Sequence, residues 1–349
     1  MLQYYFKKPG VIQQRQAEKP LCGDDEVLIR VAQIGLCGSD LHLYSGTYSG
    51  PLQYPVMFGH EWSGVVEEVG SRVGGFAAGD WVTGDCSCYC GHCDVCQTNK
   101  NLCDKIEKFG ITIDGASAQY IVRNQRYVYK APQGLPRDLI CLTEPVAVAA
   151  QMLHQLAAME DLKKKKILVY GGGTIGMAVL MLLVYHYQCG DVSLYDLVDN
   201  RNALAKELGA TIPREQDLSY APKSGSYGDI YAAGRYDIII ETTGSPIVLA
   251  HSFNIIKTRG IIGCLGMMDE AVIPQKMIVT KGLRVVGSIG GTGQFPMVME
   301  FMTEQADVAR RLISGRFSAE EMEQAFVAAK DIERSLKVVI DFSEELTKV

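Results

Sequence analysis

The pattern of apolar and polar positions changes twice along the chain and predicts three segments. Between residues 20 and 135, short stretches such as VLIRVA, WSGVVEEVG and DWVTGD alternate or end in glycine and aspartate, which predicts β-strands. From about residue 142 to 284, apolar runs such as ILVYG and YDIIIET alternate with helical patterns such as DNRNALAKELGA, which predicts a parallel sheet covered by helices. Beyond that, SAEEMEQAFVAAKD predicts an amphipathic helix behind a serine cap.

The longest apolar tract, ILVYGGGTIGMAVLMLLVYHYQ, begins at Ile167 and is interrupted by glycines. It predicts a buried strand that turns into a buried helix, not a membrane span. A chain of 349 residues with 47% hydrophobic content can bury a large core in two domains. Its net charge of −6 gives no general attraction to nucleic acid or anionic membranes. The N-terminal MLQYYFKKPG lacks the apolar core of a secretion signal, so a cytoplasmic location is expected.

The stretch CYCGHCDVCQTNKNLC holds five of the eleven cysteines. A cytoplasmic chain keeps its thiols reduced, and a redox pair would need only two cysteines. Four thiolates match a closed tetrahedral Zn²⁺ site, which leaves no position open for chemistry. The sequence therefore predicts a structural zinc lobe, with another metal such as an iron–sulfur cluster as the alternative; its ligands would be Cys90, Cys93, Cys96 and Cys103.

A glycine-rich loop follows the apolar strand that begins at Ile167. Glycines at positions 171, 173 and 176 precede a helical run, and Asp196 ends the next apolar strand. This context predicts a dinucleotide site in which the pyrophosphate approaches the glycines and the acid accepts hydrogen bonds from the adenosine ribose. The acid favours NAD over NADP, although Arg201 leaves this preference open. The alternative is a structural turn in an α/β protein. The predicted contacts are Gly171, Gly173, Thr174, Ile175, Gly176, Asp196 and Arg201.

Two further stretches, GLCGSDLHLY and GHEWSG, contain candidate metal ligands in the β-rich segment. Cys37 and His60 suit zinc, and Asp40 and Glu61 are either ligands or supporting groups. The alternative is that the cysteine and the histidine belong to the core.

Taken in order, CGSD-L-H, GHE-x-x-G, the cysteine lobe, LTEPVAVA and GGGTIG resemble the zinc-dependent medium-chain dehydrogenase/reductases of the alcohol dehydrogenase superfamily. The similarity is to the branch of sorbitol, other polyol and threonine dehydrogenases. The resemblance implies an α/β chain with a chaperonin-10-like, β-rich catalytic domain and a Rossmann doubly wound parallel sheet. The implied domains are 1–147 with the zinc lobe at 86–104, an NAD-binding domain at 148–284, and a return to the catalytic domain at 285–349.

The resemblance also implies a second, catalytic zinc bound by Cys37, His60 and Glu144, with one position left open. Glu61 would be a transient ligand, because its permanent binding would leave the site with a net negative charge. Asp40 would hold the His60 ring. The implied cofactors are therefore two zinc ions per chain and NAD.

In the implied reaction, a secondary alcohol loses a proton through Ser39, the nicotinamide ribose and His42, and a hydride to the nicotinamide. The expected substrate is a sugar alcohol, sugar acid or cyclitol, and the expected assembly a homodimer or homotetramer. The alternatives are a threonine-type dehydrogenase and a non-catalytic NAD(P)H-binding member of the fold. A nucleic-acid-binding zinc lobe is disfavoured, because its lysines are balanced by acids.

Overall fold

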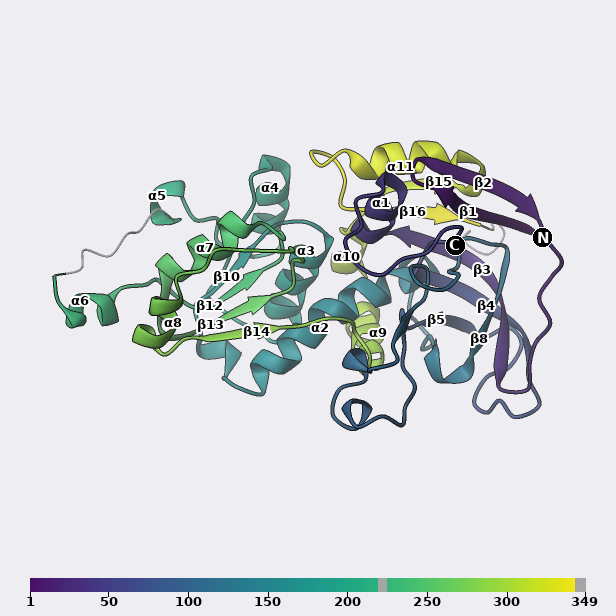
Figure 1. Cartoon of the computed structure of the whole chain (residues 1–349), viewed down its shortest axis with the longest axis horizontal. Coiled ribbons are helices and arrows are strands. Elements are labelled where there is room, and N and C mark those ends of the chain that lie inside the picture. Colours follow the sequence, from purple (N-terminus) through teal and green to yellow (C-terminus); the bar gives the residue numbers. More distant parts are fainter. Residues whose placement is uncertain (219–224, 343–349) are drawn as a thin grey trace. The chain divides into compact units, whose positions relative to one another are not determined.

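The computed structural model describes residues 1–218 and 225–342, and the chain divides into two compact units. Unit 1 combines Met1–Ala147 with the chain from Gly290 onward, and unit 2 is Val148–Ile289. The polypeptide therefore starts in unit 1, forms unit 2 and returns to unit 1 (Figure 1).

Unit 1 is built on a seven-stranded mixed sheet with the order β15-β16-β3-β4-β5-β9, in which β8 also pairs with β3. Two small antiparallel pairs, β1 with β2 and β6 with β7, complete the β-structure described for this unit. The strands are β1 (Leu2–Lys8), β2 (Val11–Gln16), β3 (Glu26–Leu36), β4 (Glu61–Val69), β5 (Trp81–Gly84), β6 (Ser87–Cys88), β7 (Glu107–Lys108), β8 (Tyr120–Asn124), β9 (Val128–Lys130), β15 (Ile313–Ser318) and β16 (Lys337–Asp341).

The core of unit 1 joins both ends of the chain. Phe6 of β1 stacks on Phe58, and Phe326 packs edge-on against both rings. Phe326 belongs to helix α11 (Met322–Lys330), the helix that the sequence predicts behind Ser318, and a capping box at Ser318 is present. The other helices of this unit are α1 (Gly38–Ser45), α9 (Phe295–Glu304) and α10 (Ala306–Arg310).

Unit 2 is a parallel sheet with the order β11-β10-β12-β13-β14. An isolated parallel bridge joins Ser193 of β11 to Thr211, which adds the vestige of a further strand at that edge. With this bridge counted, the strand order is that of a dinucleotide-binding Rossmann sheet, so the predicted fold class is confirmed here. The strands are β10 (Ile167–Tyr170), β11 (Val192–Tyr195), β12 (Tyr236–Glu241), β13 (Ile256–Cys264) and β14 (Arg284–Gly287).

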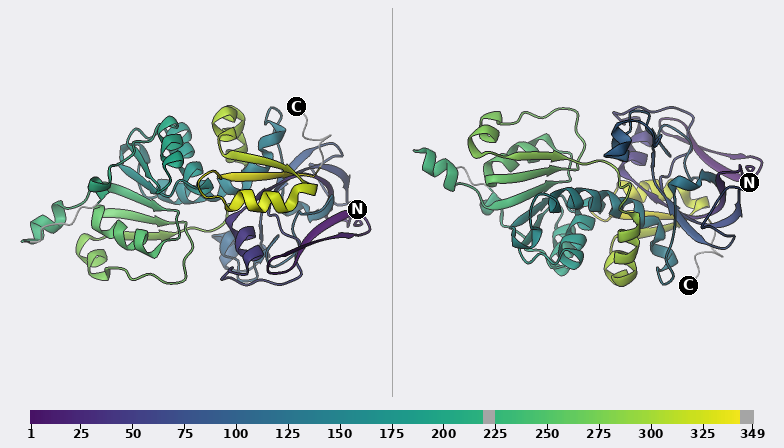
Figure 2. Two further views of the ribbon diagram at one scale, coloured as in Figure 1. Left: turned by 90° about the horizontal axis from the view of Figure 1, so that it is seen from above. Right: turned by 90° about the horizontal axis from the view of Figure 1, so that it is seen from below.

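Helices cover both faces of this sheet (Figure 2). All four residues of β10 are buried, as expected for a strand covered on both sides. The tract that begins at Ile167 forms β10, the glycine turn and helix α3, as predicted. The helices are α3 (Thr174–Met181), α4 (Asp199–Glu207), α5 (Glu215–Leu218), α6 (Tyr227–Ala232), α7 (Pro246–Ile255) and α8 (Gln275–Lys281).

Helix α2 (Thr143–Ala157) begins in unit 1 and ends in unit 2. Together with the preceding turn, Arg137–Ala157 is long and apolar enough to cross a membrane. However, 83% of its most apolar window is buried inside the protein, which is the burial of a core helix.

Candidate metal and dinucleotide sites

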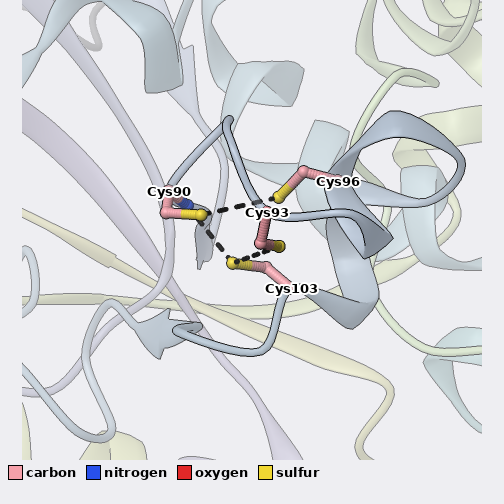
Figure 3. Close-up of side chains that lie close together, drawn as sticks. All are labelled: Cys90, Cys93, Cys96 and Cys103. Atoms are coloured by element: carbon pink, nitrogen blue, oxygen red, sulfur yellow. Dashed lines mark hydrogen bonds between the residues drawn. The ribbon is translucent and has the colours of Figure 1, made fainter.

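The four cysteines predicted to form a metal lobe lie together in unit 1 (Figure 3). Their sulfur atoms all lie within 4.8 Å of one another. The Sγ atoms of Cys90 and Cys96 are 3.9 Å apart, and those of Cys93 and Cys103 are 3.8 Å apart. A tetrahedron with Zn–S bonds of about 2.3 Å places its sulfur atoms about 3.8 Å apart. The observed spacing therefore fits zinc, and it is far too long for a disulfide of about 2 Å.

Backbone N–H groups support the sulfur atoms of this lobe. The N–H groups of Cys90 and Lys105 both point at Cys103 Sγ, at 3.3 and 3.4 Å. A backbone hydrogen bond from His92 is the main cause that lowers the pKa of Cys90 to about 6. These groups stabilise thiolate charge, and a thiolate is the form of cysteine that binds a metal.

A second group of candidate ligands lies at the start of α1 and the start of β4. Cys37 directly precedes α1, while His60 and Glu61 stand where β4 begins. One ligand atom from each of these three residues lies within 4.8 Å of the other two. The structure therefore brings together three of the residues that the two sequence stretches contributed.

Asp40 connects the two segments that carry this second group. Its carboxylate is fully buried and accepts the N–H of Cys37 at 2.9 Å and that of Gly59 at 3.2 Å. Nδ1 of His60 lies 3.8 Å from Asp40 Oδ1 and has no hydrogen-bond partner within the described residues. Burial raises the pKa of Asp40, and the nearby imidazole opposes this rise. Asp40 thus lies beside the His60 ring, and its role in orienting that ring stays a prediction.

Glu61 forms a buried ion pair that the sequence analysis missed. Lys337 Nζ lies 2.7 Å from Oε1 and 2.5 Å from Oε2 of Glu61, and it also donates to the carbonyl of Leu36 at 2.9 Å. Both side chains are at most 3% exposed. Glu61 is therefore held and neutralised by a cation from β16, whereas the sequence-based argument treated it as an uncompensated acid. A lysine at the start of the apolar strand KVVID was the one signal that might have drawn attention to it.

Glu144 lies in the first turn of α2 and is 5% exposed. It is not in the group whose ligand atoms lie within 4.8 Å of one another. Burial raises its pKa to about 8, and the fields of Glu61 and Cys37 act in the same direction against that of His60. Glu144 therefore stands in the electrostatic neighbourhood of the group, and its role as a ligand stays a prediction.

The charges of this neighbourhood fit a divalent cation. Loss of water around the sulfur, with the field of Glu61, raises the pKa of Cys37 to about 12. Glu61, which is already paired with Lys337, interacts electrostatically with three further acidic groups, namely Cys37, Asp40 and Glu144. Buried acids keep their charge only when a cation compensates them, and a sulfur, an imidazole and carboxylates are the ligands that zinc uses in catalytic sites.

The two predicted proton carriers lie on α1 beside this group. Ser39 and His42 are three residues apart on the helix, so they share one face. Ser39 Oγ lies 3.9 Å from Cys37 Sγ, and the exposed His42 has its Nδ1 2.9 Å from Thr47 Oγ1. Ser39 is half-buried and His42 is exposed, and their role as proton carriers stays a prediction.

In unit 2 the glycine loop connects β10 to α3. Gly171 has a φ of +95°, and a Cβ at Gly176 would lie 1.8 Å from the carbonyl oxygen of Gly171. The first glycine therefore permits the turn, and the other permits the close approach of helix and strand. A Cβ at Gly173 would meet no atom within 4 Å, so the loop is open to a ligand at that point. Thr174 and Ile175 follow as the first residues of α3. This is the geometry of a phosphate site at a helix N-terminus.

Asp196 follows β11, the strand beside β10 in the sheet. Its Oδ2 accepts the N–H of Gly172 at 2.6 Å and lies 3.4 Å from Nη1 of Arg201. The structure therefore brings the predicted acid, the predicted arginine and the glycine loop together.

Family models match both parts of the chain. The model for the alcohol dehydrogenase GroES-like domain matches residues 23–133, and that for the glucose dehydrogenase C-terminus matches residues 137–342. The chain belongs to the zinc-dependent medium-chain dehydrogenase/reductases. The GroES-like, chaperonin-10-related fold predicted for the β-rich part is thereby confirmed, and this dehydrogenase is an NAD(P)-binding oxidoreductase of the alcohol and polyol dehydrogenase family.

Curated relatives of this dehydrogenase share a quarter or more of its residues over most of its length. The starvation-sensing protein RspB of Escherichia coli is 27% identical over 97% of this chain and 98% of its own. The L-threonine 3-dehydrogenase of a Marinomonas species is 28% identical over 88% and 89%, respectively. The sorbitol dehydrogenase of Bacillus subtilis is 28% identical over 92% and 91%. The chain therefore lies in the predicted branch.

Solved structures agree over almost the whole dehydrogenase. The E. coli alcohol dehydrogenase RspB, complexed with NADH, has a TM-score of 0.87 at 26% identity and covers 98% of this chain and 99% of its own. A zinc-binding dehydrogenase of Sinorhizobium meliloti bound to NADP has a TM-score of 0.84 at 27% identity, with coverages of 97% and 98%. One neighbour thus carries NADH and the other NADP.

Proposed function

We propose that this dehydrogenase transfers a hydride between NAD and a polyol-type secondary alcohol, namely a sugar alcohol, a sugar acid or a cyclitol. The observation that carries the proposal is the group of Cys37, His60 and Glu61, in which a cysteine and a histidine lie beside a carboxylate that already has its own cation. The sorbitol dehydrogenase among its relatives supports the polyol class.

The catalytic zinc would be held by Cys37, His60 and Glu144. When bound, zinc supplies a Lewis acid that lowers the pKa of a substrate hydroxyl. Lys337 keeps the charge of Glu61 compensated, so one thiolate and one carboxylate suffice to neutralise the metal. Asp40 orients the His60 ring from behind. A second zinc would be held by the four cysteines of the lobe, where no position remains open for substrate.

The proton of the alcohol would leave along α1. Ser39 Oγ would accept it while giving up its own hydroxyl proton towards His42, and the exposed ring of His42 would release a proton to solvent. The protein's remaining tasks are to orient the substrate and to exclude water while the hydride moves.

The cofactor would bind the loop and acid of unit 2. Gly171, Gly173, Thr174, Ile175 and Gly176 would contact the pyrophosphate, and Asp196 would accept the ribose hydroxyls. The Asp196 carboxylate repels a 2′-phosphate, which favours NAD. Arg201 pairs with this carboxylate, so its charge is partly compensated and use of NADP is reduced rather than abolished.

The proposed catalytic domain is unit 1, Met1–Ala147 with the chain from Gly290 onward, and the proposed NAD domain is unit 2, Val148–Ile289; strand β14 belongs to unit 2, so the boundary lies beyond the expected residue 284. We further propose a cytoplasmic homodimer or homotetramer that acts on a small molecule, with no nucleic-acid or membrane partner. The edge strand β14, which exposes Val285, is a candidate contact.

The proposal is tested by zinc content measured together with NAD reduction over a panel of polyols, cyclitols, sugar acids and threonine. We expect two zinc ions per chain and turnover of at least one polyol. In Glu144→Ala, we expect loss of one zinc and of turnover. A matched control is Asp138→Ala, which removes an acid from the preceding turn that pairs with Arg310 and should leave both zinc ions in place.

The panel also separates the alternatives. If only threonine is turned over, the substrate is a 3-hydroxy amino acid and not a polyol; one relative is named for this activity. One zinc per chain, NADH binding and no turnover would identify a non-catalytic member of the fold.

A further inference from the structure

A buried carboxylate lies at the end of β12, on the edge of the sheet where the glycine loop also lies. Glu241 is the last residue of this strand and is fully buried. Its Oε1 accepts the N–H of Thr243 at 2.6 Å, the N–H of Gly244 at 3.0 Å and the hydroxyl of Thr243. One oxygen of the side chain thus anchors the loop that follows β12.

The backbone of the same residue anchors the next loop. The carbonyl oxygen of Glu241 accepts the N–H groups of Leu265 at 2.9 Å and of Gly266 at 3.1 Å, just beyond the end of β13. The backbones of the two loops are in direct contact at Gly266 and Gly244. A Cβ at Gly266 would lie only 2.1 Å from the nitrogen of Gly244, so there is no room for a side chain between them. Thr242, the next residue, donates its hydroxyl to the carbonyl of Tyr170 at 2.7 Å, at the start of the glycine loop. Three loops are therefore fastened at one place.

The other carboxylate oxygen of Glu241, Oε2, destabilises the fold. Oε2 is buried and has no hydrogen-bond partner within the described residues. It packs against Gly266, where an added Cβ would lie only 2.5 Å from this oxygen. A buried oxygen without a donor destabilises a fold. Such buried groups in native proteins call for an explanation, and the position of the loops that Glu241 holds supplies one. An apolar side chain of the same length would avoid this cost but would lose the anchors on Oε1.

The position of these loops indicates what they are for. Asp196, at the end of β11, marks the adenosine side of the dinucleotide site, and the glycine loop after β10 marks the pyrophosphate. Neighbouring strands lie about 4.8 Å apart, so a ligand that crosses the strand ends in the same direction next reaches β12 and β13. These are the two strands whose loops Glu241 fastens together. In the proposed complex with NAD, the nicotinamide half would therefore lie at these two loops.

We infer that Glu241 is a positioning residue for the nicotinamide half of the dinucleotide: it holds the loops after β12 and β13 in the arrangement that receives that half. The inference rests on the proposed NAD binding. The residue acts through the backbone of the loops, so its removal affects nicotinamide binding and leaves adenosine binding unchanged.

The test compares the affinities for NADH and for ADP, which has no nicotinamide half, in the full chain. In Glu241→Met we expect the Kd for NADH to rise about tenfold or more, as when hydrogen bonds to a charged group are lost. The Kd for ADP should stay within twofold. The thermal midpoint should fall, because methionine leaves the N–H groups of Thr243 and Gly244 without their acceptor, and this loss outweighs the removal of the unsatisfied oxygen. Glu241→Gln keeps an acceptor for the three donors and should restore most of the NADH affinity.

Two further variants keep the inference falsifiable if Glu241→Met does not fold. Thr243→Val removes one donor from an exposed position and should weaken NADH severalfold without changing ADP binding. Asp237→Asn is the matched control: it alters an acid at the opposite end of the same strand, which accepts the N–H of Lys166 at 2.8 Å and pairs with Lys257, and it should change neither affinity.

The outcomes separate this inference from the proposed function. If the native chain binds neither NADH nor ADP, the proposed dinucleotide site is wrong. If Asp196→Ala weakens both ligands while Glu241→Met and Thr243→Val leave NADH within twofold of the native value, the dinucleotide site stands and the role of Glu241 is refuted. Equal weakening of NADH and ADP in these variants would also refute it, because that result indicates a purely structural residue.

Discussion

The two clusters of candidate metal ligands in unit 1 differ in their donor atoms and in the charges around them. The lobe offers four sulfur atoms whose spacing matches a zinc tetrahedron, with backbone N–H groups behind them. The group around Cys37 offers a sulfur, an imidazole and a carboxylate, with a buried lysine and a buried aspartate in contact. The first cluster is complete by itself, whereas the second depends on residues contributed from several distant strands and loops. A metal that only holds a fold needs the first arrangement, and a metal that performs chemistry needs the adjustable charge of the second.

Removal of one sulfur from the lobe is expected to have the largest effect on either cluster. In Cys103→Ser, the hydroxyl stays protonated and does not replace a thiolate, so the lobe should lose its zinc. Structural zinc sites contribute about 10 kcal/mol or more of binding free energy to the folding of their segment. We expect zinc per chain to fall by one and residues 88–104 to become sensitive to protease. Cys22→Ser, outside the lobe, is the control; an unchanged zinc content in Cys103→Ser would refute the four-sulfur site.

Removal of the lysine tests the second cluster. Lys337→Met leaves the carboxylate of Glu61 buried beside other acids without its cation. Loss of one partner of a buried pair costs about 3–5 kcal/mol, to be measured as the free energy of unfolding in urea. The double variant Lys337→Met/Glu61→Gln should recover most of this loss, since no charge then remains unpaired. If the double variant is as unstable as the single one, the lysine acts by packing and the charge argument is wrong.

A change at Asp40 should affect only one of the two clusters, the one that contains Cys37 and His60. Asp40→Asn places an amide where the carboxylate receives the N–H groups of Cys37 and Gly59. Loss of such a support typically reduces metal affinity by about 10–100-fold. Competition with a chromophoric chelator should detect this change for one zinc per chain, and the lobe zinc serves as the internal control. If the zinc affinity changes less than threefold, Asp40 does not support His60 as a metal ligand.

The difference between the clusters also explains how far the sequence could predict them. The lobe and the glycine loop are each encoded within one short segment, so spacing and residue type sufficed to predict both. Alternation of apolar residues predicted β3, and continuous apolar runs predicted strands of unit 2 such as β10 and β12. The partner of Glu61 lies 276 residues away in the chain. No local pattern specifies such a contact, because it arises from the antiparallel pairing of both β16 and β4 with β3.

Glu241 escaped prediction for a related reason. In the sequence it stands at the end of an apolar strand, a position where an acid is typical of the beginning of a solvent-exposed loop. Its burial follows from the two loops that close over it, and the nearness of Gly244 and Gly266 makes that closure possible. A single strand carries no information on the loops of its neighbours. The fold class was therefore predictable, while the residues that hold its functional edge were not.

The smallest effect is expected from a histidine that belongs to neither cluster. His92 lies inside the lobe sequence between two cysteines, yet its ring is exposed and its Nδ1 lies 3.1 Å from the carbonyl of Cys90. His92→Ala should leave zinc content unchanged and alter the free energy of unfolding by at most about 0.5 kcal/mol, as surface substitutions do. His60→Ala, by contrast, should lose one zinc and the catalytic turnover. A zinc loss in His92→Ala would mean that the lobe uses an imidazole, and the distinction between an all-sulfur site and a mixed site would then fail.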